Sequence, residues 1–191
     1  SNWYWKFTGN NPAGESIIYV AESDGELVSC FHAIPIWCWI NGEKIRGSHS
    51  IGMIVKPEWQ NRGIIKFVAD KLIEELENQK IPFTYGYPNE NSYDLHVQHL
   101  RYEDISMQPI IERELDETFD IRLNNFSSTL KFKRIDHFDD SVDTLWNEVK
   151  NGFKAIVIRT ADFLNWRYFA KPDARYFAFG SYARDKLVGY C

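Results

Sequence analysis

The stretch VKPEWQNRGII, residues 55–65, says more about the fold than any other part of this chain. An apolar run at 51–55 leads into it, and an amphipathic pattern follows it. A strand that feeds a helix through a short polar loop exposes backbone N–H groups that have no partner inside the helix. Because the helix dipole is also positive at that end, the stretch predicts an anion site, and first of all a site for a phosphate-bearing ligand.

The clearest predicted helix covers residues 64–79, directly after that loop. Its apolar side chains recur at intervals of three and four residues, while charged side chains fill the opposite face. The apolar positions are Ile64, Ile65, Val68, Leu72, Ile73 and Leu76. This spacing is typical of an amphipathic helix with one buried face.

Turn-forming pairs divide the flanking sequence into short strands. Asp24-Gly25 and Asn41-Gly42 are typical of tight turns. A second, shorter helix is expected over residues 91–100, capped by Asn89 or Asn91. The expected strands cover residues 16–22, 27–34, 48–55, 83–87 and 107–113. The first half of the chain is therefore predicted to be an α/β unit.

The pattern weakens over residues 116–128, and a second set of elements follows. Two helices are expected, one capped around Asp139 and ending near Lys150, the other covering residues 161–168. The expected strands cover residues 132–135, 176–182 and 187–190, the last two joined by a turn at Arg184-Asp185. We accordingly divide the chain into a domain at 1–120 and a partial second unit at 130–191.

The two halves share an internal repeat. Trp5-Lys6-Phe7 and Trp166-Arg167-Tyr168 are both aromatic-basic-aromatic triplets, and each is followed by a proline and a hairpin pattern. The sequence predicts a duplication in which the second copy lacks its own phosphate loop and the first copy begins at its triplet. Two interpretations stay open: the chain is a fragment of a longer tandem protein, or elements of the second half complete the first.

Composition narrows the class of protein. The 191 residues are 44% apolar and 26% charged, which is ordinary for a soluble globular protein. The net charge of −5 argues against nucleic acid as a partner, because nucleic-acid-binding domains usually carry a basic face. Cys30, Cys38 and Cys191 lack metal-type spacing and are interpreted as reduced thiols of a cytoplasmic protein. No apolar run reaches the roughly 18 residues of a membrane span, and no signal peptide is visible, so no membrane partner is expected.

The order of hairpin, long strand, loop, helix, strand and helix resembles the GCN5-related N-acetyltransferase (GNAT) superfamily. The acyl-CoA loop of that family has the pattern Gln/Arg-x-x-Gly-x-Gly/Ala, which Gln60-x-x-Gly63-x-Ile65 matches through Gly63. The resemblance covers about residues 3–113, and the repeated half looks like the opening of a second such domain. It implies an α/β fold with a mixed sheet and a partial second copy. Tandem copies with the triplet at 166–168 look like bacterial acetyltransferases of cell-surface polysaccharide pathways.

This resemblance implies acetyl-CoA, or another acyl-CoA, as the cofactor. Backbone N–H groups of the loop would hold its pyrophosphate, and Gly63 lets the backbone approach closely because it has no Cβ. Backbone groups of Ile54 and Val55 would pair with the pantetheine arm like an added strand. Asn89 or Asn91 would hydrogen-bond the cofactor from the second helix. The loop residues that the resemblance assigns to the cofactor are Gln60, Asn61, Arg62, Gly63, Ile64 and Ile65.

Two positions depart from the family pattern. The sixth loop position is Ile65 instead of Gly or Ala, and its side chain is expected to point into the core. Val97 stands where a tyrosine of the second helix often protonates the leaving sulfur, and valine has no proton to donate. Tyr93, one turn earlier, and Tyr85, on the preceding strand, are the remaining candidates for this acid.

Two residues are candidates for the base that takes the proton of the amine. His49 titrates near neutrality when it is unperturbed, and Glu22 lies at the end of an expected strand. Each has a structural alternative: a histidine on a solvated strand face, and a surface glutamate before a turn.

A pair of histidines and a tryptophan-rich stretch each allow a structural role as readily as a functional one. His96 and His99 lie three residues apart, as metal ligands can, but no second ligand group is evident, so we expect a helix surface and no metal. Trp37-Cys38-Trp39 would either line an acceptor pocket for a sugar or pack in the core or an interface.

The sequence thus predicts an acyl-CoA-dependent N-acetyltransferase whose acceptor is a small-molecule amine. We expect this acceptor to be an amino sugar of cell-surface polysaccharide synthesis. One alternative is a non-catalytic acyl-CoA-binding module, which Val97 favours. Another is a tRNA-dependent aminoacyl transferase of cell-wall synthesis, against which the acidic net charge speaks. A homodimer is left open as the assembly.

Overall fold

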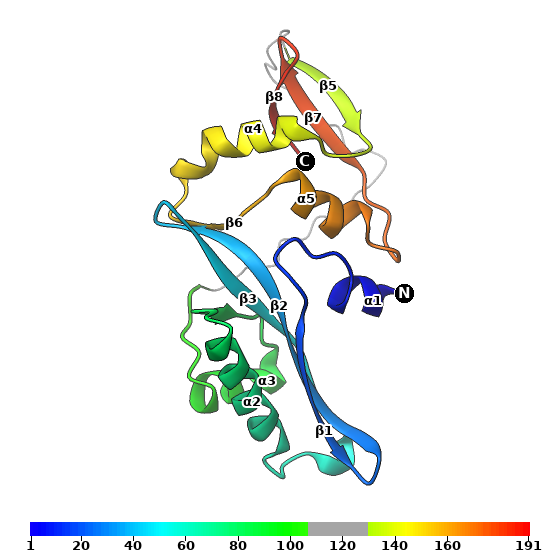
Figure 1. Cartoon of the computed structure of the whole chain (residues 1–191), viewed down its shortest axis with the longest axis vertical. Helices are drawn as coiled ribbons and strands as arrows, with labels where there is room; N and C mark the ends of the chain where they lie inside the picture. Colours follow the sequence, from blue (N-terminus) through cyan, green and yellow to red (C-terminus); the bar gives the residue numbers. More distant parts are fainter. Residues whose placement is uncertain (107–129) are drawn as a thin grey trace, which may run out of the picture.

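The computed structural model describes residues 1–106 and 130–191 (Figure 1). The strand expected at 107–113 and the boundary expected at 116–128 lie outside the described residues. In the part of the chain that is described, no helix is long and apolar enough to cross a membrane.

Within the described residues, the larger of two sheets is mixed and has five strands. β1 (Ile17–Ser23), β2 (Glu26–Ile40) and β3 (Glu43–Val55) are antiparallel neighbours, and β4 (Thr84–Tyr85) adds in parallel to β3. β6 (Ala155–Val157), from the second half of the chain, pairs with β2 beyond the end of β1. The mixed sheet with its helices confirms the predicted fold class.

β2 is longer than predicted, because it continues through Pro35 to Ile40. Opposite Pro35, Ser48 donates its N–H to the carbonyl of Phe83 and not to β2. The carbonyl of Pro35 accepts a hydrogen bond from Asn11 Nδ2 at 2.8 Å. Since the N–H and C=O of one strand residue point to the same side, the missing N–H of Pro35 faces the gap between β1 and β6. The prediction that the strand ends at 34 was wrong. Pro35 does not interrupt the sheet, because no neighbouring strand needs a hydrogen bond from its nitrogen.

Two other strand boundaries differ from the prediction. β3 begins at Glu43 and not at 48, because Asn41 and Gly42 both adopt positive φ, 50° and 89°, and close the β2–β3 hairpin directly. The strand predicted at 83–87 is reduced to Thr84–Tyr85, since the chain leaves β3 before Pro88, which has no N–H to pair.

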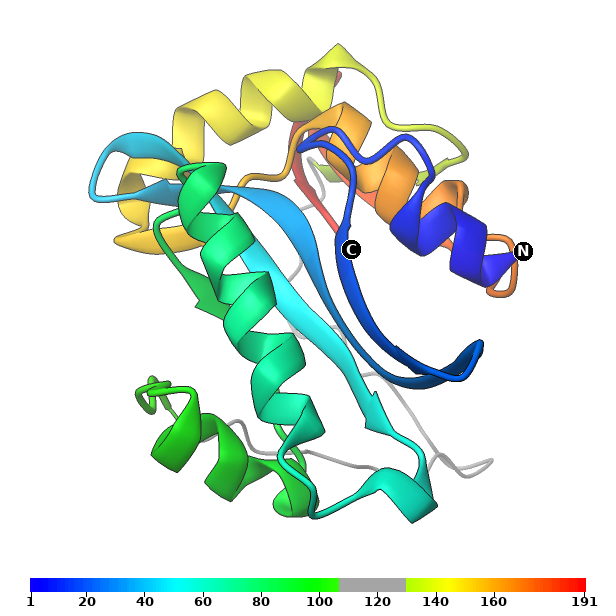
Figure 2. The same ribbon diagram turned by 60° about the horizontal axis from the view of Figure 1, so that its bottom comes forward.

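Two helical segments follow β3 and β4 in the chain. α2 (Ile64–Asn78) lies along one face of the larger sheet, as Figures 1 and 2 show, and confirms the predicted helix. α3 (Glu90–Asp94) is capped by the side chain of Asn89 and continues as a π-helical segment, η2 (Leu95–His99). The core that these helices close consists of Ile17, Phe31, Ala33, Val68, Ala69, Leu72, Leu76, Ile81 and Leu100.

The opposite face of this sheet contacts helices from both ends of the chain. α1 (Asn2–Phe7) lies beside α5 (Ala161–Leu164) and its π-helical continuation η4 (Asn165–Phe169) in both ribbon views. The indole rings of Trp5 and Trp166 stack with centroids 5.5 Å apart and an interplanar angle of 27°. Trp5 Nε1 also donates to the carbonyl of Trp166 at 2.8 Å. Both tryptophans are buried together with Phe7 and Ile34, so this cluster joins the two halves.

The second half of the chain builds a sheet of its own, drawn at the top of Figure 1. β5 (Leu130–Ile135), β7 (Ala178–Ala183) and β8 (Lys186–Tyr190) are antiparallel in the order β5-β7-β8. Arg184 and Asp185 adopt positive φ, 49° and 65°, and make the turn that the sequence predicted.

One longer helix covers this smaller sheet. α4 (Asp140–Val149) is capped by Asp139, whose carboxylate accepts the N–H of Ser141 at 3.0 Å, and a 3-10 turn, η3 (Lys150–Gly152), follows it. The second core consists of Ile135, Phe138, Val142, Ala161, Leu164, Ala178 and Leu187. The second half thus has its own core and also lends β6 to the larger sheet. The division at 1–120 and 130–191 remains a prediction.

Truncation of the stacked indole tests how much this contact stabilises the fold. Trp166→Ala is expected to lower the free energy of unfolding by about 3–5 kcal/mol, because it removes a buried aromatic ring and leaves a cavity. Urea unfolding followed by circular dichroism measures the loss. Trp3→Ala is the matched control, because Trp3 is 54% exposed on α1, the helix that carries the stacking partner Trp5. An equal loss of unfolding free energy in Trp166→Ala and Trp3→Ala would show that the stacked indole does not contribute specifically to stability.

Candidate active site

β3 carries a bulge near its end. Cys30 pairs with Ile54 and His32 pairs with Ile51, so two residues of β3 oppose the single residue Phe31 of β2. Gly52 lies in the bulge with φ 66°, and a Cβ built on it would come 2.6 Å from His32 Nδ1. The bulge therefore needs glycine both for its backbone conformation and for the space that the imidazole occupies.

β4 leaves β3 just before this bulge. The two strands pair only at Ser48↔Thr84 and His49↔Tyr85. Ser50 Oγ then donates to the carbonyl of Tyr85 at 3.2 Å, and a Cβ on Gly86 would come 2.7 Å from that hydroxyl. In the described chain, β3 beyond residue 50 thus has no strand beside it on this edge. An open edge of this kind can accept an extended ligand as an added strand.

The hydrogen bonds of β3 show which backbone groups face that open edge. Lys56 donates its N–H to Val28, and the carbonyl of Ile54 accepts Ser29 Oγ at 3.0 Å, so Ile54 faces β2. Because alternate residues of a strand face opposite edges, Val55 faces the open edge instead. Of the two residues predicted to pair with pantetheine, the geometry favours Val55 and not Ile54.

The loop after β3 ends in an uncapped helix terminus. Asn61 and Gly63 both adopt positive φ, 58° and 74°, and Gly63 precedes α2 without any side-chain hydrogen bond to the first turn. A Cβ on Gly63 would meet nothing within 4 Å. Gln60 Nε2 donates to the carbonyl of Val55 at 3.2 Å and holds the loop against the strand. The first N–H groups of a 15-residue helix therefore face open solvent, as an anion site requires.

The side chains around the loop are also accounted for. Ile64 and Ile65 pack against the core beneath α2, so the isoleucine at the sixth loop position points inward as expected. The guanidinium of Arg62 lies 5.0 Å from the ring of Trp59, which follows β3 in the 3-10 turn η1 (Pro57–Trp59). The larger side chain of Ile65, where the family has Gly or Ala, therefore does not fill the space in front of Gly63.

Three aromatic side chains gather where β3 and β4 diverge. His49 stacks on Tyr85 with centroids 4.8 Å apart and an angle of 6°, and Tyr87 lies edge-on to both at 5.7 and 6.0 Å. We call His49, Tyr85 and Tyr87 the aromatic cluster. Burial, together with the charges of Lys6 and Arg167, lowers the pKa of His49 to about 4. Burial raises the pKa of Tyr85 to about 12. At neutral pH the cluster thus combines a neutral imidazole with a protonated phenol.

The structure does not bring the other two catalytic candidates to this cluster. Glu22 is exposed and pairs with Leu27 near the β1–β2 turn, whereas His49 pairs with Ile34. Seven residues along β2 separate these levels, or roughly 23 Å at the rise of a strand. Tyr93 is exposed, and its hydroxyl donates to Asp104 at 2.6 Å, which raises the pKa of Tyr93.

The two asparagines predicted to contact cofactor lie at the start of α3. The side-chain oxygen of Asn89 accepts the N–H of Ser92 at 3.1 Å, so this atom already serves as the helix cap. Asn91 is exposed on the first turn. Their contact with cofactor stays a prediction, and for Asn89 it would rest on the amide nitrogen.

The predicted surface position of His96 is corrected. His96 is buried and not on the helix surface, because it lies edge-on to Phe31 and Tyr102, while His99 is exposed. No group of three or more side chains that could hold a metal ion occurs within residues 1–106 and 130–191.

The Trp37–Trp39 stretch packs against two lysines and against the second half of the chain. Lys44 lies over the ring of Trp37 at 4.3 Å and Lys150 over that of Trp39 at 4.7 Å. Cys38 and Trp39 pair with β6, which makes this part of β2 an interface between the halves. Burial raises the pKa of Cys38 to about 11, and all three cysteines are free thiols.

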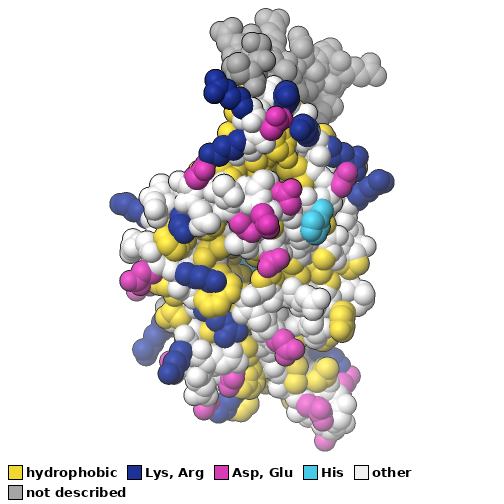
Figure 3. All heavy atoms as spheres, turned by 45° about the horizontal axis from the view of Figure 1, so that its top comes forward, with side chains coloured by type: hydrophobic (Ala, Val, Ile, Leu, Met, Phe, Trp, Pro, Cys, Tyr) yellow, Lys and Arg dark blue, Asp and Glu magenta, His cyan; other side chains and the backbone are white. Residues whose placement is uncertain are grey.

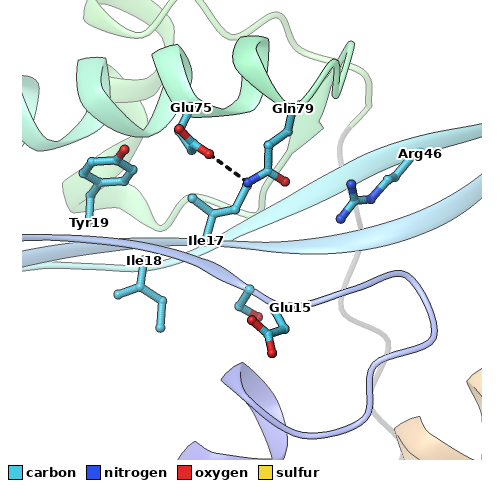
Figure 4. A pocket seen from close by; sticks show the side chains of 8 residues that line it. Glu15, Ile17, Ile18, Tyr19, Arg46, Glu75 and Gln79 are labelled. Atoms are coloured by element: carbon cyan, nitrogen blue, oxygen red, sulfur yellow. Dashed lines mark hydrogen bonds between the residues drawn. The ribbon is translucent and has the colours of Figure 1, made fainter.

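A hollow of about 600 Å³ lies elsewhere, between β1 and the end of α2 (Figure 4). Arg46 and Glu15 are among the residues that line it, and Gln79 donates to Glu75 at 2.9 Å along its rim. Gln79 follows α2 at the end opposite Gly63, roughly 20 Å away along the helix. The hollow is therefore separate from the candidate site.

Sequence reasoning missed several residues of the site. Gly52, Ser50 and Gly86 shape the bulge and the divergence of β4, and Tyr87 completes the aromatic cluster. A lone glycine inside a strand pattern is a known sign of a bulge, so Gly52 carried a usable signal. Lys6 lies 43 residues before His49 in the chain and Arg167 lies 118 residues after it, so only tertiary packing brings them to the site. The triplets marked both residues in the sequence, but not as part of this site.

The low pKa of His49 makes a testable contribution to stability. In the unfolded chain the imidazole titrates near 6.5, so between pH 6.5 and 4 the unfolded state binds the proton that the folded state refuses. Stability should fall over this window by up to about 3 kcal/mol from this group as the pH is lowered. Urea unfolding at pH 7 and pH 4.5 should show a smaller fall for His49→Gln than for the wild type. If the free energy of unfolding fell equally in both proteins between pH 7 and pH 4.5, the pKa of His49 would not be the cause.

Comparisons with known proteins find one matching family and several similar folds. Residues 4–94 match the family model described as an acetyltransferase (GNAT) domain. A solved structure from Enterococcus faecalis, described as a conserved protein of unknown function and probable N-acyltransferase, is 16% identical with a TM-score of 0.63; the match covers 92% of this chain and 44% of that one. An acetyltransferase from Trypanosoma brucei is 16% identical with a TM-score of 0.45, over 53% of this chain and 71% of that one. No curated protein matches the sequence.

The Enterococcus structure shows that the arrangement of both halves recurs as a fold. This chain spans less than half of that protein, and the low identity limits the likeness to architecture. The family match falls on the segment that contains α1, the bulged strand and α2. That segment, a little under half of the chain, is a GNAT-type N-acetyltransferase domain and belongs to the GCN5-related N-acetyltransferase superfamily.

Proposed function

We propose that this chain binds acetyl-CoA along the open edge of β3 and transfers the acetyl group to a small-molecule amine. One observation carries the proposal: the uncapped N-terminus of α2, with open space before Gly63, directly follows a strand that has no partner on this edge among the described residues. The first feature suits a pyrophosphate and the second suits the extended pantetheine arm. The two features are consecutive in the chain, as one elongated ligand requires.

The residues present fit the cofactor. N–H groups of the loop and first turn, from Asn61 to Ile65, would hold the pyrophosphate, and Gln60 would keep the loop in place through Val55. When it is bound, acetyl-CoA supplies a thioester that is activated for attack by an amine. Val55 would align the arm through its backbone groups.

The aromatic cluster supplies the proton transfers. Neutral His49 accepts the proton that the amine loses as the new N–C bond forms. The phenol of Tyr85, protonated at neutral pH, donates a proton to the sulfur as the C–S bond breaks. Tyr85 would thereby replace the tyrosine that Val97 does not provide. A non-catalytic acyl-CoA-binding module is the second candidate, because Val97 removes the usual donor.

The acceptor, location and assembly are part of the proposal. An amino sugar remains the acceptor class that we favour from the sequence resemblance. A cytoplasmic location is supported by the three free cysteines. The interspersed acidic and basic side chains on the face in Figure 3 support a small molecule over nucleic acid. A homodimer stays open.

A substitution at the loop tests cofactor binding. Gly63→Glu should weaken acetyl-CoA binding at least tenfold, because it places a carboxylate and bulk against the pyrophosphate; isothermal titration calorimetry measures the change. Gly42→Glu is the matched control, since Gly42 also has positive φ and open space around it but lies in the β2–β3 turn. Wild-type protein that gives no heat and no thermal shift with acetyl-CoA would refute the transferase proposal.

Substitutions in the aromatic cluster test catalysis. His49→Gln and Tyr85→Phe should each lower kcat roughly 100-fold, the usual size of a lost general acid or base, while acetyl-CoA affinity stays unchanged. Tyr93→Phe serves as the comparison, because it removes a phenol that already donates to Asp104. If Tyr93→Phe lost activity and Tyr85→Phe did not, the acid would be Tyr93. Acetyl-CoA binding without transfer to any amine would favour the non-catalytic module.

A further inference from the structure

We infer that the acceptor carries an anionic group, a carboxylate or a phosphate, and that Lys6 and Arg167 bind this group beside the aromatic cluster. The inference rests on the proposed function and specifies the acceptor of the same site. It depends on three observations: where the two cations lie, what pairs with them, and which parts of the chain supply them.

The stacked tryptophans hold the two cations near the site. Lys6 and Arg167 each follow one of the stacked indoles, Trp5 and Trp166, in sequence. These indoles pack against Ile34, and Ile51 packs on the same cluster. Ile51 lies two residues after His49 on β3, so both side chains face this side of the sheet. Lys6 and Arg167 are thus held on the face of the sheet where His49 lies.

No carboxylate of residues 1–106 or 130–191 forms an ion pair with Lys6 or Arg167. Arg167 Cζ and Lys171 Nζ each lie 5.9 Å from the ring of Trp5. Lys171 has a partner, Asp173, at 3.7 Å. Within the described residues, by contrast, neither Lys6 nor Arg167 makes an ion pair. Two half-buried cations without a carboxylate leave a positive site that an anion can fill.

The electrostatics of the neighbouring groups agree with this arrangement. Burial is the first cause, and the charges of Arg167 and Lys171 the next, of a lowered pKa of Lys6. The same two cations, Lys6 and Arg167, contribute after burial to the low pKa of His49. An anion bound between them would offset this field and raise the pKa of His49. His49 would then become a better proton acceptor only when an anionic acceptor is in place.

The site needs both halves of the chain. Lys6 and Arg167 occupy the middle position of the two triplets, Trp5-Lys6-Phe7 and Trp166-Arg167-Tyr168. One cation therefore comes from each copy of the repeat, and the contact between the triplets brings the two together. This gives the second half a role in acceptor recognition, although the cofactor features lie in the first.

Binding of small anions tests the site directly. Sodium phosphate and sodium succinate are titrated by calorimetry into protein saturated with CoA, so that the terminus of α2 is already occupied. Lys6→Gln and Arg167→Gln should each weaken the binding of one of these anions at least tenfold, and Arg167→Lys, which keeps the charge, should retain it within a few-fold. Lys44→Gln is the control, because Lys44 also lies over a tryptophan but on the β2–β3 hairpin. Anion affinity that is equal in wild type and both glutamine variants would overturn the inference.

Matched acceptors test the same point through turnover. Glucosamine is compared with glucosamine 6-phosphate, and alaninamide with alanine. The wild type should acetylate the anionic member of one pair with a kcat/KM at least tenfold higher, and both glutamine variants should lose this preference while they bind acetyl-CoA normally. The pair that shows the preference identifies phosphate or carboxylate. Equal rates within both pairs, with acetyl-CoA binding intact, would overturn this inference alone, whereas failure of the wild type to bind acetyl-CoA would overturn the proposed function and this inference together.

Discussion

The stack of Trp5 on Trp166 is the contact on which the relation between the two halves depends. It buries two large aromatic surfaces, and the Trp5 indole N–H is satisfied by the backbone of η4. Burial of rings of this size is among the larger single contributions to stability in a domain. Because the indoles come from the two triplets of the repeat, one contact both joins the sheets and brings Lys6 and Arg167 to one face.

The functional edge of β3 follows from a second constraint, the divergence of β4. Ser50 holds the carbonyl of Tyr85, and Gly86 leaves room for its hydroxyl, so the strands part just after the aromatic cluster. The bulge at Gly52 then changes which backbone groups face the open edge. The geometry for cofactor and the geometry for proton transfer thus arise within a few residues of each other, where regular pairing ends.

Much of this was predictable from local sequence. The loop at 60–65, the helix after it, the Asn89 cap and the two triplets all carry spacing or turn chemistry that acts within one element. The predictions that failed concerned long-range partners. Whether Pro35 ends a strand depends on what lies beside it, and β6 pairs with β2 from more than 110 residues away. His96 is buried because Phe31 covers it. The pattern of apolar residues along the helix of His96 could not indicate this partner.

The sequence by itself was enough to predict an anion site at the loop and the GNAT family of the first half, because phosphate binding at a helix terminus needs only consecutive residues with the right backbone freedom. Only the tertiary structure decided which of the candidate side chains lie together. It separated Glu22 from His49 along β2, engaged Tyr93 with Asp104, and placed Tyr85 against His49. The physical reason is that a proton-transfer site, and a cation pair such as Lys6 and Arg167, are built from residues whose neighbours in space are remote in the chain.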